Sequence, residues 1–373
     1  MTFRALLVVT SLTAAAITAG AQTRKEPKRV GLDEQAMLTT IVENAAEGKH
    51  TEGNAWLTWA PHFLRGPERK TYIPFTLKVE EAPGAFRSAA MYVRVAPRGD
   101  LGRAGKRAEG VQNILGVASG EMPVNSPERR QGVGAPTAMD ASLMLRSLTA
   151  RNAQAYPYEA AFGVETIETG GRIGILRRGL ALPPGEYDLY IALLERDRKG
   201  AKKWAVLKQP ITVPDLSSAG LCLSSVILAD AVEPLARPVP PSEQAQRPYA
   251  FGRAEIVPAL DDELTPDETL HVAFLIYGAE PDPQGRPDVK IEYLLYQQNF
   301  TGERLLGATP PQVMNASTLP AEFDLRTGQQ LAAMQSLPLS RYKPGSYRLA
   351  IRVTDQRTGA AAEESARFVL VQR

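Results

Sequence analysis

The chain has 373 residues, which is long for one ordinary β-sandwich and sufficient for two domains. Hydrophobic residues make up 44% of it, so each half can bury a core, and 30 glycines with 29 prolines favour turn-rich β structure over a helical bundle. The formal net charge of +2 gives no reason to expect nucleic acid or an anionic membrane surface as a partner.

The first 21 residues have the pattern of a secretory signal peptide. Arg4 precedes an apolar run over residues 5–19, and Ala19-Gly20-Ala21 has the small-x-small spacing of a signal-peptidase site. A transmembrane anchor is the alternative, but the run is shorter than the roughly 20 residues that a span needs. We predict cleavage after Ala21, a secreted or periplasmic location, and no transmembrane segment after cleavage. Removal of this segment leaves 42 basic and 41 acidic residues.

Residues 22–50 are predicted to be a polar segment that contains one amphipathic helix, at about residues 33–47. Acidic residues suit the first turn of that helix, and Gly48 suits its end. Apolar side chains recur at helical spacing at Leu38, Ile41, Val42 and Ala45. We expect the helix to pack on the first domain, and an independent arm is the alternative.

A first β-sandwich domain is predicted over residues 51–214, with an irregular insertion at residues 97–157. Strand signals occur at residues 56–59, 72–79, 89–96, 158–167, 172–182 and 203–213. Pro74 argues for an edge position or a bulge in its strand. The insertion is rich in Gly, Arg and Ala, and loops of this length are usually functional or disordered. We interpret it as a mobile insertion, with a binding loop as the alternative.

Residues 215–220 are predicted to be a linker, and residues 221–373 a second β-sandwich domain. An apolar run opens this domain, and a proline-rich stretch at residues 234–248 reads as an exposed loop. Strand signals occur at residues 221–228, 255–257, 270–277, 289–297, 329–336, 345–354 and 365–371. Roughly seven short strands between turn signals is the number found in immunoglobulin-like and fibronectin-like sandwiches.

One phrase occurs twice, at residues 182–191 and 342–351. Each copy has Pro-Gly, one residue, Tyr, and then apolar side chains at every second position. Pro-Gly favours a tight turn, and the alternation predicts a half-buried strand that starts a hairpin. The hydroxyls of Tyr187 and Tyr347 are expected to bond backbone near the turn, as in a tyrosine corner.

The second copy and its continuation, residues 343–370, resemble the final hairpin of secreted bacterial immunoglobulin-like modules. The first copy departs from that pattern at its next turn, which reads Arg198-Lys199-Gly200. Residues 221–228 also resemble segments of secreted proteins from soil bacteria. The resemblance covers about a third of the chain, and it implies a mainly β protein with two tandem immunoglobulin-like or fibronectin-like β-sandwich domains and a short N-terminal helix. It implies no catalytic residues.

The sequence contains no recognisable catalytic or metal-binding constellation. The three histidines, His50, His62 and His271, have no metal-ligand spacing, and no GxSxG, Walker or GxGxxG motif is present. His62 is interpreted as a packing or capping residue and His271 as a surface residue. The single cysteine, Cys222, lies in an apolar run and is interpreted as a buried, unreactive thiol. We therefore predict no catalytic, cofactor-binding or metal-ligating residue, and no cofactor.

Three sets of residues bear on other possible functions. Acidic residues at 261–263 and 267–268 look like a solvated turn, and a carboxylate-based, glycosidase-like hydrolase is the alternative. Asp282 and Asp288 bracket a Pro-Gln-Gly-Arg-Pro stretch that lacks the oxygen ligands of a calcium loop. A carbohydrate-binding module would need exposed aromatic side chains, and the candidates are Trp56, Trp59, Phe63, Tyr293 and Tyr296.

The signal peptide and the duplicated hairpin favour a non-catalytic binding or scaffold protein of the cell envelope. We expect no enzymatic activity. Its partner is expected to be a protein or an envelope glycan, and not a nucleic acid. A sandwich fold alone does not decide among a scaffold, a hydrolase and a carbohydrate-binding module.

Overall fold

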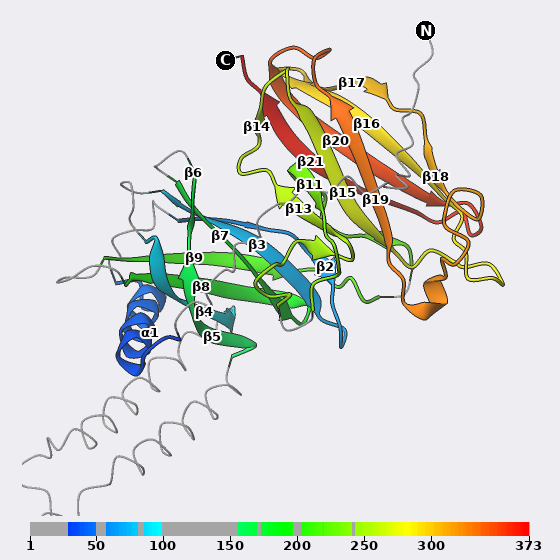
Figure 1. Cartoon of the computed structure of the whole chain (residues 1–373). Coiled ribbons are helices and arrows are strands. Elements are labelled where there is room, and N and C mark those ends of the chain that lie inside the picture. The colour runs from blue at the N-terminus through cyan, green and yellow to red at the C-terminus, as the bar shows by residue number, and fades with distance from the viewer. Residues whose placement is uncertain are drawn as a thin grey trace, which may run out of the picture. The chain divides into compact units, whose positions relative to one another are not determined.

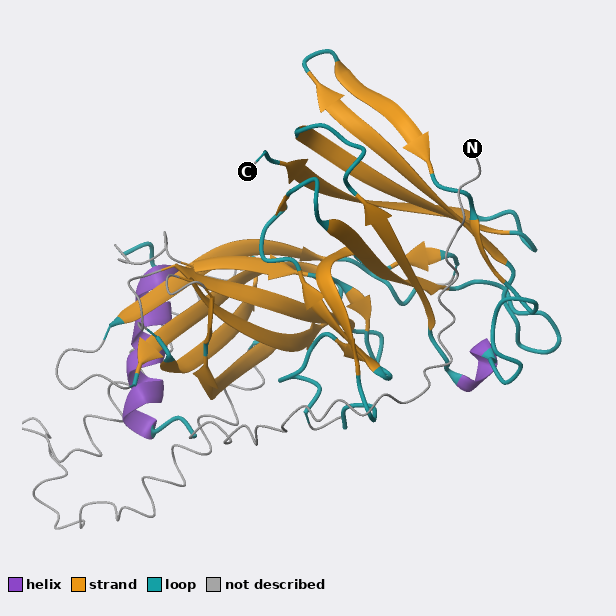
Figure 2. Ribbon diagram, turned by 45° about the horizontal axis from the view of Figure 1, so that its top comes forward, coloured by secondary structure: helices purple, strands orange, loops and turns teal. Residues whose placement is uncertain are grey.

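A computed structural model of the chain describes residues 29–49, 57–80, 86–98, 156–169, 173–196, 203–218, 220–240 and 243–372. It is mainly β, with several sheets and one α-helix among these residues, as predicted (Figures 1 and 2). No described helix is long and apolar enough to cross a membrane. The predicted signal peptide, His50, Trp56 and most of the insertion at residues 97–157 lie outside the described residues.

The described residues form two compact units. The N-terminal unit comprises residues 27–61 and 70–215, and the C-terminal unit includes residues 62–69 and 216–373. The predicted first domain, by comparison, kept residues 62–69 with the rest of residues 51–214. The chain therefore passes between the units at residues 61–62, 69–70 and 215–216, and each unit is described separately below.

The N-terminal unit contains two antiparallel sheets. One has the order β1 (Leu57–Pro61), β3 (Thr71–Glu80), β7 (Ile173–Leu182), β6 (Ile167–Thr169). The other has the order β5 (Tyr158–Glu165), β4 (Ser88–Pro97), β8 (Gly185–Glu195), β9 (Trp204–Val213). The guanidinium of Arg178 on β7 lies 4.9 Å from the centre of the Phe162 ring on β5, within the roughly 6 Å over which a cation is attracted to an aromatic face. The two sheets therefore face each other.

Helix α1 (Leu32–Ala46) covers the outer face of the second of these sheets. Its buried side chains are Leu38, Ile41, Val42 and Ala45, which are the four predicted from the spacing. They share a core with residues of β4, β8 and β9, namely Ala90, Tyr92, Tyr190, Ala192, Leu194 and Val206. The ion pair between Arg196 and Glu34, 2.7 Å long, fixes the first turn of the helix. The predicted helix and its packing on the first domain are confirmed.

A glycine and a proline lie inside strands of this unit. Gly179 lies inside the continuous strand β7, and a Cβ atom at Gly179 would lie 2.3 Å from the hydroxyl of Tyr72. The glycine therefore makes room for the tyrosine ring. Pro74 lies in β3, which has neighbours on both sides and is not the predicted edge strand. The β1 ladder ends with the pair Pro61 and Phe75, so no β1 partner faces the missing amide of Pro74.

The C-terminal unit also contains two sheets. One has the order β10 (Cys222–Leu223), β15 (Thr269–Tyr277), β11 (Ile227–Pro234), β13 (Ala254–Pro258), β12 (Ala250–Phe251), and β19 (Leu331–Pro338) also pairs with β15. The other has the order β14 (Glu263–Leu264), β21 (Ala361–Leu370), β20 (Gly345–Asp355), β16 (Val289–Asn299), β17 (Gly302–Ala308), and β18 (Gln312–Met314) also pairs with β16. The two-residue strand β2 (Leu64–Arg65) belongs to this unit by its contacts.

The core of the C-terminal unit lies between its two sheets. Phe274 on β15 meets Tyr293 on β16 edge to face, with ring centroids 6.3 Å apart. Alternate residues of β16 and β20, including Ile291 and Ile351, are fully buried in the same cluster as Ala333 of β19. This alternation is the predicted period of two, and it turns one face of each strand toward the other sheet.

The strand orders of the two units match. In the N-terminal unit the sheets contain β1-β3-β7 and β9-β8-β4-β5, and in the C-terminal unit they contain β11-β15-β19 and β21-β20-β16-β17. Seven strands therefore follow one another with the same connections in both units. The repeated phrase forms the sixth strand of each set, β8 and β20, and the closing hairpin follows it.

The two copies of the phrase adopt the same local structure. The hydroxyl of Tyr187 donates to the carbonyl oxygen of Pro183 at 3.0 Å, and that of Tyr347 donates to the carbonyl oxygen of Lys343 at 2.5 Å. Both tyrosine rings are buried, with 7% and 2% of their surface exposed. The predicted bond between each hydroxyl and the backbone near the turn is confirmed.

Replacement of either corner tyrosine by phenylalanine is expected to destabilise the unit that carries it. Tyr187→Phe and Tyr347→Phe each remove the hydrogen bond from the buried tyrosine to the backbone carbonyl near the turn, which costs about 1 kcal/mol of unfolding free energy. Urea denaturation of the purified chain measures the loss. Tyr296→Phe is the control, because the Tyr296 ring is half-exposed and its contact with the Arg348 guanidinium does not use the hydroxyl. Equal stability of all three variants and the parent would contradict the role of the corners.

Candidate functional site

Three connections meet at one end of the C-terminal sandwich. Residues 278–288 join β15 to β16, residues 315–330 join β18 to β19, and residues 356–360 join β20 to β21. The buried carboxylate of Asp355 accepts hydrogen bonds from the amides of Glu280, at 2.7 Å, and Arg357, at 2.8 Å. A carboxylate at the end of β20 thus joins the first connection to the third.

The first connection is a tight turn closed by Asp282. Its Oδ1 atom accepts from the amides of Gln284, at 2.9 Å, and Arg286, at 2.8 Å. The Asp282 amide in turn donates to the carbonyl oxygen of Arg286 at 2.8 Å. Asp282 therefore stabilises the turn.

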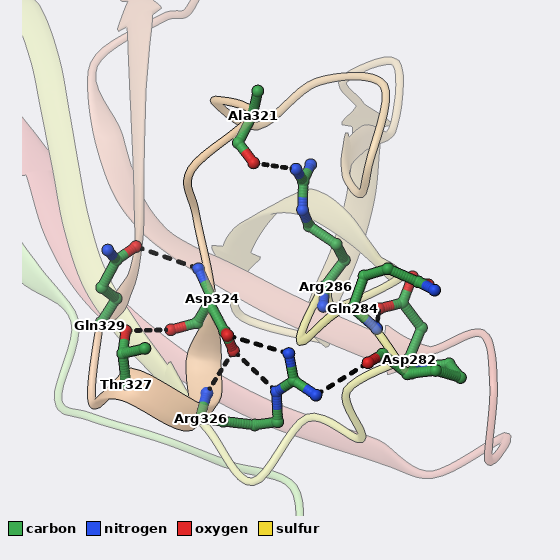
Figure 3. A network of polar contacts seen from close by, with 9 residues as sticks. Asp282, Gln284, Arg286, Ala321, Asp324, Arg326, Thr327 and Gln329 are labelled. Atoms are coloured by element: carbon green, nitrogen blue, oxygen red, sulfur yellow. Dashed lines mark hydrogen bonds and ion pairs between the residues drawn. The ribbon is translucent and has the colours of Figure 1, made fainter.

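Asp324 and Arg326 organise the second connection (Figure 3). The carboxylate of Asp324 caps the short 3-10 helix Leu325–Thr327 by accepting from the Arg326 amide at 2.8 Å. The Arg326 guanidinium returns to both oxygens of the same carboxylate, each at 3.0 Å. These hydrogen bonds hold the pKa of Asp324 below its ordinary value.

Direct bonds then join the first and second connections. Nη1 of Arg326 donates to the carbonyl oxygen of Pro283 at 2.8 Å, and the Leu325 amide donates to that of Gly285 at 2.9 Å. The Arg286 guanidinium crosses in the other direction and donates to the carbonyl oxygen of Ala321 (Figure 3). We call residues 280–288, 316–327 and 355–358 the loop platform.

Gly285 shows how closely the loops of the platform approach. Its φ is 82°, in the left-handed region, and a Cβ atom there would lie 1.8 Å from Oδ1 of Asp324. Only glycine fits between the two connections. The platform is therefore a fixed polar surface, with exposed groups such as Gln284 and Arg326 at its rim.

A second polar cluster lies in the N-terminal unit, between α1 and β4. Arg94 donates to Oε1 of Glu159 at 3.1 Å and to the Tyr92 hydroxyl at 2.7 Å, and its guanidinium lies 4.6 Å from the centre of the Tyr156 ring. Burial raises the pKa of Glu43 on α1, and the charge of Arg94 opposes that rise. Only 7% of the Arg94 side chain is exposed, so this cluster is a buried ion pair that supports the fold.

The predicted surface and packing histidines lie as expected. His271 is half-exposed, and its Nδ1 shares a hydrogen bond with the Ser336 hydroxyl at 2.9 Å. His62 is packed edge-on against the ring of Tyr249, with centroids 5.5 Å apart. Among the residues that the structure describes, no three His, Cys, Asp or Glu side chains gather where they could hold a metal ion.

Cys222 differs from its prediction because it is partly exposed and not buried. Strand β10 has only two residues and pairs with β15 alone, so the apolar run around Cys222 is not enclosed on both sides. Its Sγ atom lies 3.7 Å from Nη2 of Arg65 and 3.9 Å from the carbonyl oxygen of Leu216.

The acidic residues considered for a hydrolase stabilise turns. Oδ1 of Asp261 accepts from the Glu263 amide at 3.2 Å, and Oε2 of Glu268 accepts from the Thr265 amide at 2.6 Å. Both contacts are local, within three residues of the acid. They match the solvated turn that the sequence predicts.

Trp59, Tyr293 and Tyr296 are the described aromatic candidates whose surroundings bear on sugar binding, and Trp56 lies outside the described residues. Trp59 is buried against Phe75, with ring centroids 6.1 Å apart. Tyr293 points into the core. Tyr296 lies on the opposite face of β16, and the Arg348 guanidinium lies 4.4 Å from the centre of the Tyr296 ring. Their odd spacing along one strand places them on opposite faces.

Sequence reasoning missed the partnership of Gly285, Asp324 and Arg326. The cap at Asp324 had a recognisable local signal, since Asp-Leu-Arg-Thr-Gly places an Asp before a short helix and a Gly after it. The contact between Gly285 and Asp324 had none, because 38 intervening residues and three further strands, β16, β17 and β18, separate the two loops.

Comparisons with known proteins give no relative from which to infer a function. No family model matches the chain, and no curated protein matches it. A crystal structure of Bacteroides uniformis β-glucuronidase aligns with 9% identity over 86% of this chain and 28% of its own, at a TM-score of 0.24. A calcium-binding mutant of Bacteroides uniformis β-glucuronidase 2 aligns with 10% identity over 86% of this chain and 27% of its own, also at a TM-score of 0.24. The chain thus spans under a third of these enzymes, and a similarity at this level says nothing about its fold or activity.

Proposed function

We propose that this protein is a non-catalytic, secreted or periplasmic binding or scaffold protein of the cell envelope. The loop platform is the observation that carries the proposal. Its three connections come from distant parts of the chain and are held together by hydrogen bonds between loops. Loops that a rigid sandwich holds in a fixed arrangement bind partners with little loss of conformational entropy.

The shared strand order supports two immunoglobulin-like or fibronectin-like sandwich domains. Such domains place three strands in one sheet and four in the other, and the connections between the sheets gather at the two ends. Both units contain a set of three strands in one sheet and four in the other, with further strands beside them, and both have a tyrosine corner before the last strand of the set. In this interpretation the loop platform occupies the end that antibody variable domains use to bind antigen.

The platform favours a protein partner over a glycan. Its polar groups include Arg, Asp, Glu, Gln, Ser and Thr side chains. Half of the Arg326 side chain is exposed, and arginine is among the residue types that are enriched at the centre of protein interfaces. An envelope glycan would stack on exposed aromatic rings, and the platform as defined holds Phe323 and no Tyr or Trp. The location in the envelope is proposed from the signal peptide pattern of residues 1–21.

Affinity capture with paired variants tests the proposal. The mature chain, Arg326→Ala and Arg304→Ala are immobilised and exposed to envelope extract of the source bacterium. Arg304 is an exposed residue of β17, outside the platform, and serves as the control. We expect one set of proteins on the parent and on Arg304→Ala, and about tenfold less of it on Arg326→Ala, because loss of an interface Arg weakens binding by that order.

Two results would contradict the proposal. One is repeated capture of no protein by the parent chain, which would remove the scaffold function. The other is equal recovery with Arg326→Ala, which would place binding outside the platform. Circular dichroism and thermal unfolding of the three samples show whether they are equally folded.

A further inference from the structure

Residues 62–69 lie in the C-terminal unit, although they follow β1 of the N-terminal unit in the chain. We call them the clip. The Phe63 amide donates to the Ser225 hydroxyl, and the Ser225 amide donates to the Phe63 carbonyl oxygen, both at 2.9 Å. Two reciprocal bonds of this kind fix the clip beside the segment that joins β10 to β11.

Arg65 fixes the middle of the clip. Its amide donates to the Tyr277 hydroxyl at 3.0 Å, and its guanidinium lies 4.5 Å from the centre of the Tyr277 ring. Nε of Arg65 donates to the carbonyl oxygen of Leu216 at 2.5 Å. None of these contacts depends on a group that titrates between pH 4 and pH 8.

His62, at the start of the clip, is different. Its Nδ1 shares a hydrogen bond of 2.9 Å with the hydroxyl of Tyr249, which is itself buried. Tyr249 packs in an apolar cluster with Ile227, Ala229, Ile256 and Ala273, and Tyr249 is the titratable group in contact with the imidazole. No carboxylate perturbs the imidazole, and burial alone lowers the pKa of His62 to about 4.

We propose that the clip is an acid-sensitive latch, which protonation of His62 releases from the C-terminal unit. The imidazole is half-buried, and its docked position against the apolar cluster around Tyr249 favours the neutral form. An imidazolium is stabilised by surrounding water or by a carboxylate, and docking replaces part of its water with apolar side chains. Protonation therefore favours the open clip, in which the ring reaches solvent.

The pH window follows from the direction of the shift. The pKa of docked His62 lies below the ordinary value of 6.5, so docking is strongest above pH 6.5 and weakens as the pH falls from 6.5 to about 4. Between pH 7 and pH 5 the equilibrium constant for opening is expected to rise about 20-fold, because the open histidine binds a proton in that range and the docked one does not.

Hydrogen exchange of the full chain, followed by mass spectrometry at pH 7 and pH 5, tests the latch. Exchange is corrected for its intrinsic pH dependence and compared for peptides of the clip and of β16 and β20. The parent chain is expected to lose about 20-fold of protection in the clip at pH 5, with β16 and β20 unchanged. His62→Phe, which keeps an aromatic ring but cannot take up a proton, is expected to show no such loss.

Tyr249→Phe separates titration from packing. It removes the hydrogen bond and keeps His62, so its clip is expected to be less protected at pH 7 and still sensitive to acid. Unchanged protection of the parent clip at pH 5 would overturn the latch. An equal acid response in His62→Phe, or an equal loss of protection in β16 and β20, would overturn it as well, because the response would then belong to other groups or to the whole unit.

Discussion

Gly278→Ala is expected to lower the unfolding free energy of the C-terminal unit by about 3 kcal/mol, from backbone strain together with overpacking. Gly278 directly follows β15 and has a φ of 70°. A Cβ atom there would lie 1.9 Å from the carbonyl oxygen of Gly220. Backbone atoms cannot rotate away as a flexible side chain can, so the backbone at Gly278 and the backbone at Gly220 would have to move apart. Chemical denaturation of the purified variant measures the loss.

Gly307→Ala is the matched control. Gly307 lies on β17 of the same unit, and a Cβ atom there would have no neighbour within 4 Å. Its φ is not in the left-handed region, so alanine is expected to change stability by less than about 0.5 kcal/mol. Equal effects of the two alanines would show that the close approach of Gly278 and Gly220 is not maintained in solution.

Arg94→Leu is expected to destabilise the N-terminal unit by about 3 kcal/mol. The substitution leaves the Glu159 carboxylate and the Tyr92 hydroxyl beneath α1 without the guanidinium that bonds both. The Glu159 carboxylate keeps its hydrogen bond from the Tyr92 hydroxyl but loses its countercharge. Most of the cost is the desolvation of this uncompensated charge, so the double variant Arg94→Leu, Glu159→Leu is expected to be more stable than the single one. Thermal or urea unfolding measures both.

An exposed ion pair supplies the comparison for Arg94. Arg352 and Glu363 lie 2.9 Å apart on neighbouring strands, with half and two-fifths of their side chains exposed. Arg352→Leu is therefore expected to cost less than about 1 kcal/mol. If Arg94→Leu cost no more than Arg352→Leu, the Arg94 cluster would be solvated and not buried.

The two ion pairs also show how the repeated sandwich differs between the units. On β8, Ala192 faces Tyr92 and Val206 on the neighbouring strands, and α1 covers this apolar face. At the same register of β20, Arg352 faces Glu292 and Glu363. The charged side chains on that face pair with one another and can remain in water, so no helix is needed to cover them. The two units share one strand order, but this face of the sheet is apolar in the N-terminal unit and charged in the C-terminal unit. This difference explains why α1 packs on the N-terminal unit.

Local signals in the sequence were sufficient for much of the fold. The spacing of Leu38, Ile41, Val42 and Ala45 determines both a helix and its buried side, and the Pro-Gly-x-Tyr phrase determines a turn, a strand and a hydroxyl bond. Each of these features depends on residues within about ten positions of one another. The predicted strand over 221–228 instead divides into β10 and β11, because the Ser224 hydroxyl donates to the Ser225 carbonyl oxygen and accepts from the Leu275 amide.

Features that depend on distant partners were not predictable. The tolerance of Gly179 inside β7 follows from the Tyr72 ring on β3, and the exposure of Cys222 follows from the shortness of β10. The loop platform needs Gly285 against Asp324, and the latch needs His62 against Tyr249, which are 187 positions apart. Single-sequence patterns record which residues can turn or cap, and they do not record which turns meet.

Site-specific photo-crosslinking in the envelope tests the binding function most directly. A photoreactive residue replaces Gln284, which is exposed on the platform, or Phe300, which is fully exposed at the tip of the β16–β17 hairpin outside it. We predict one reproducible protein adduct from position 284 and none of that mass from position 300. No adduct from position 284, or the same adduct from both positions, would contradict binding through the loop platform.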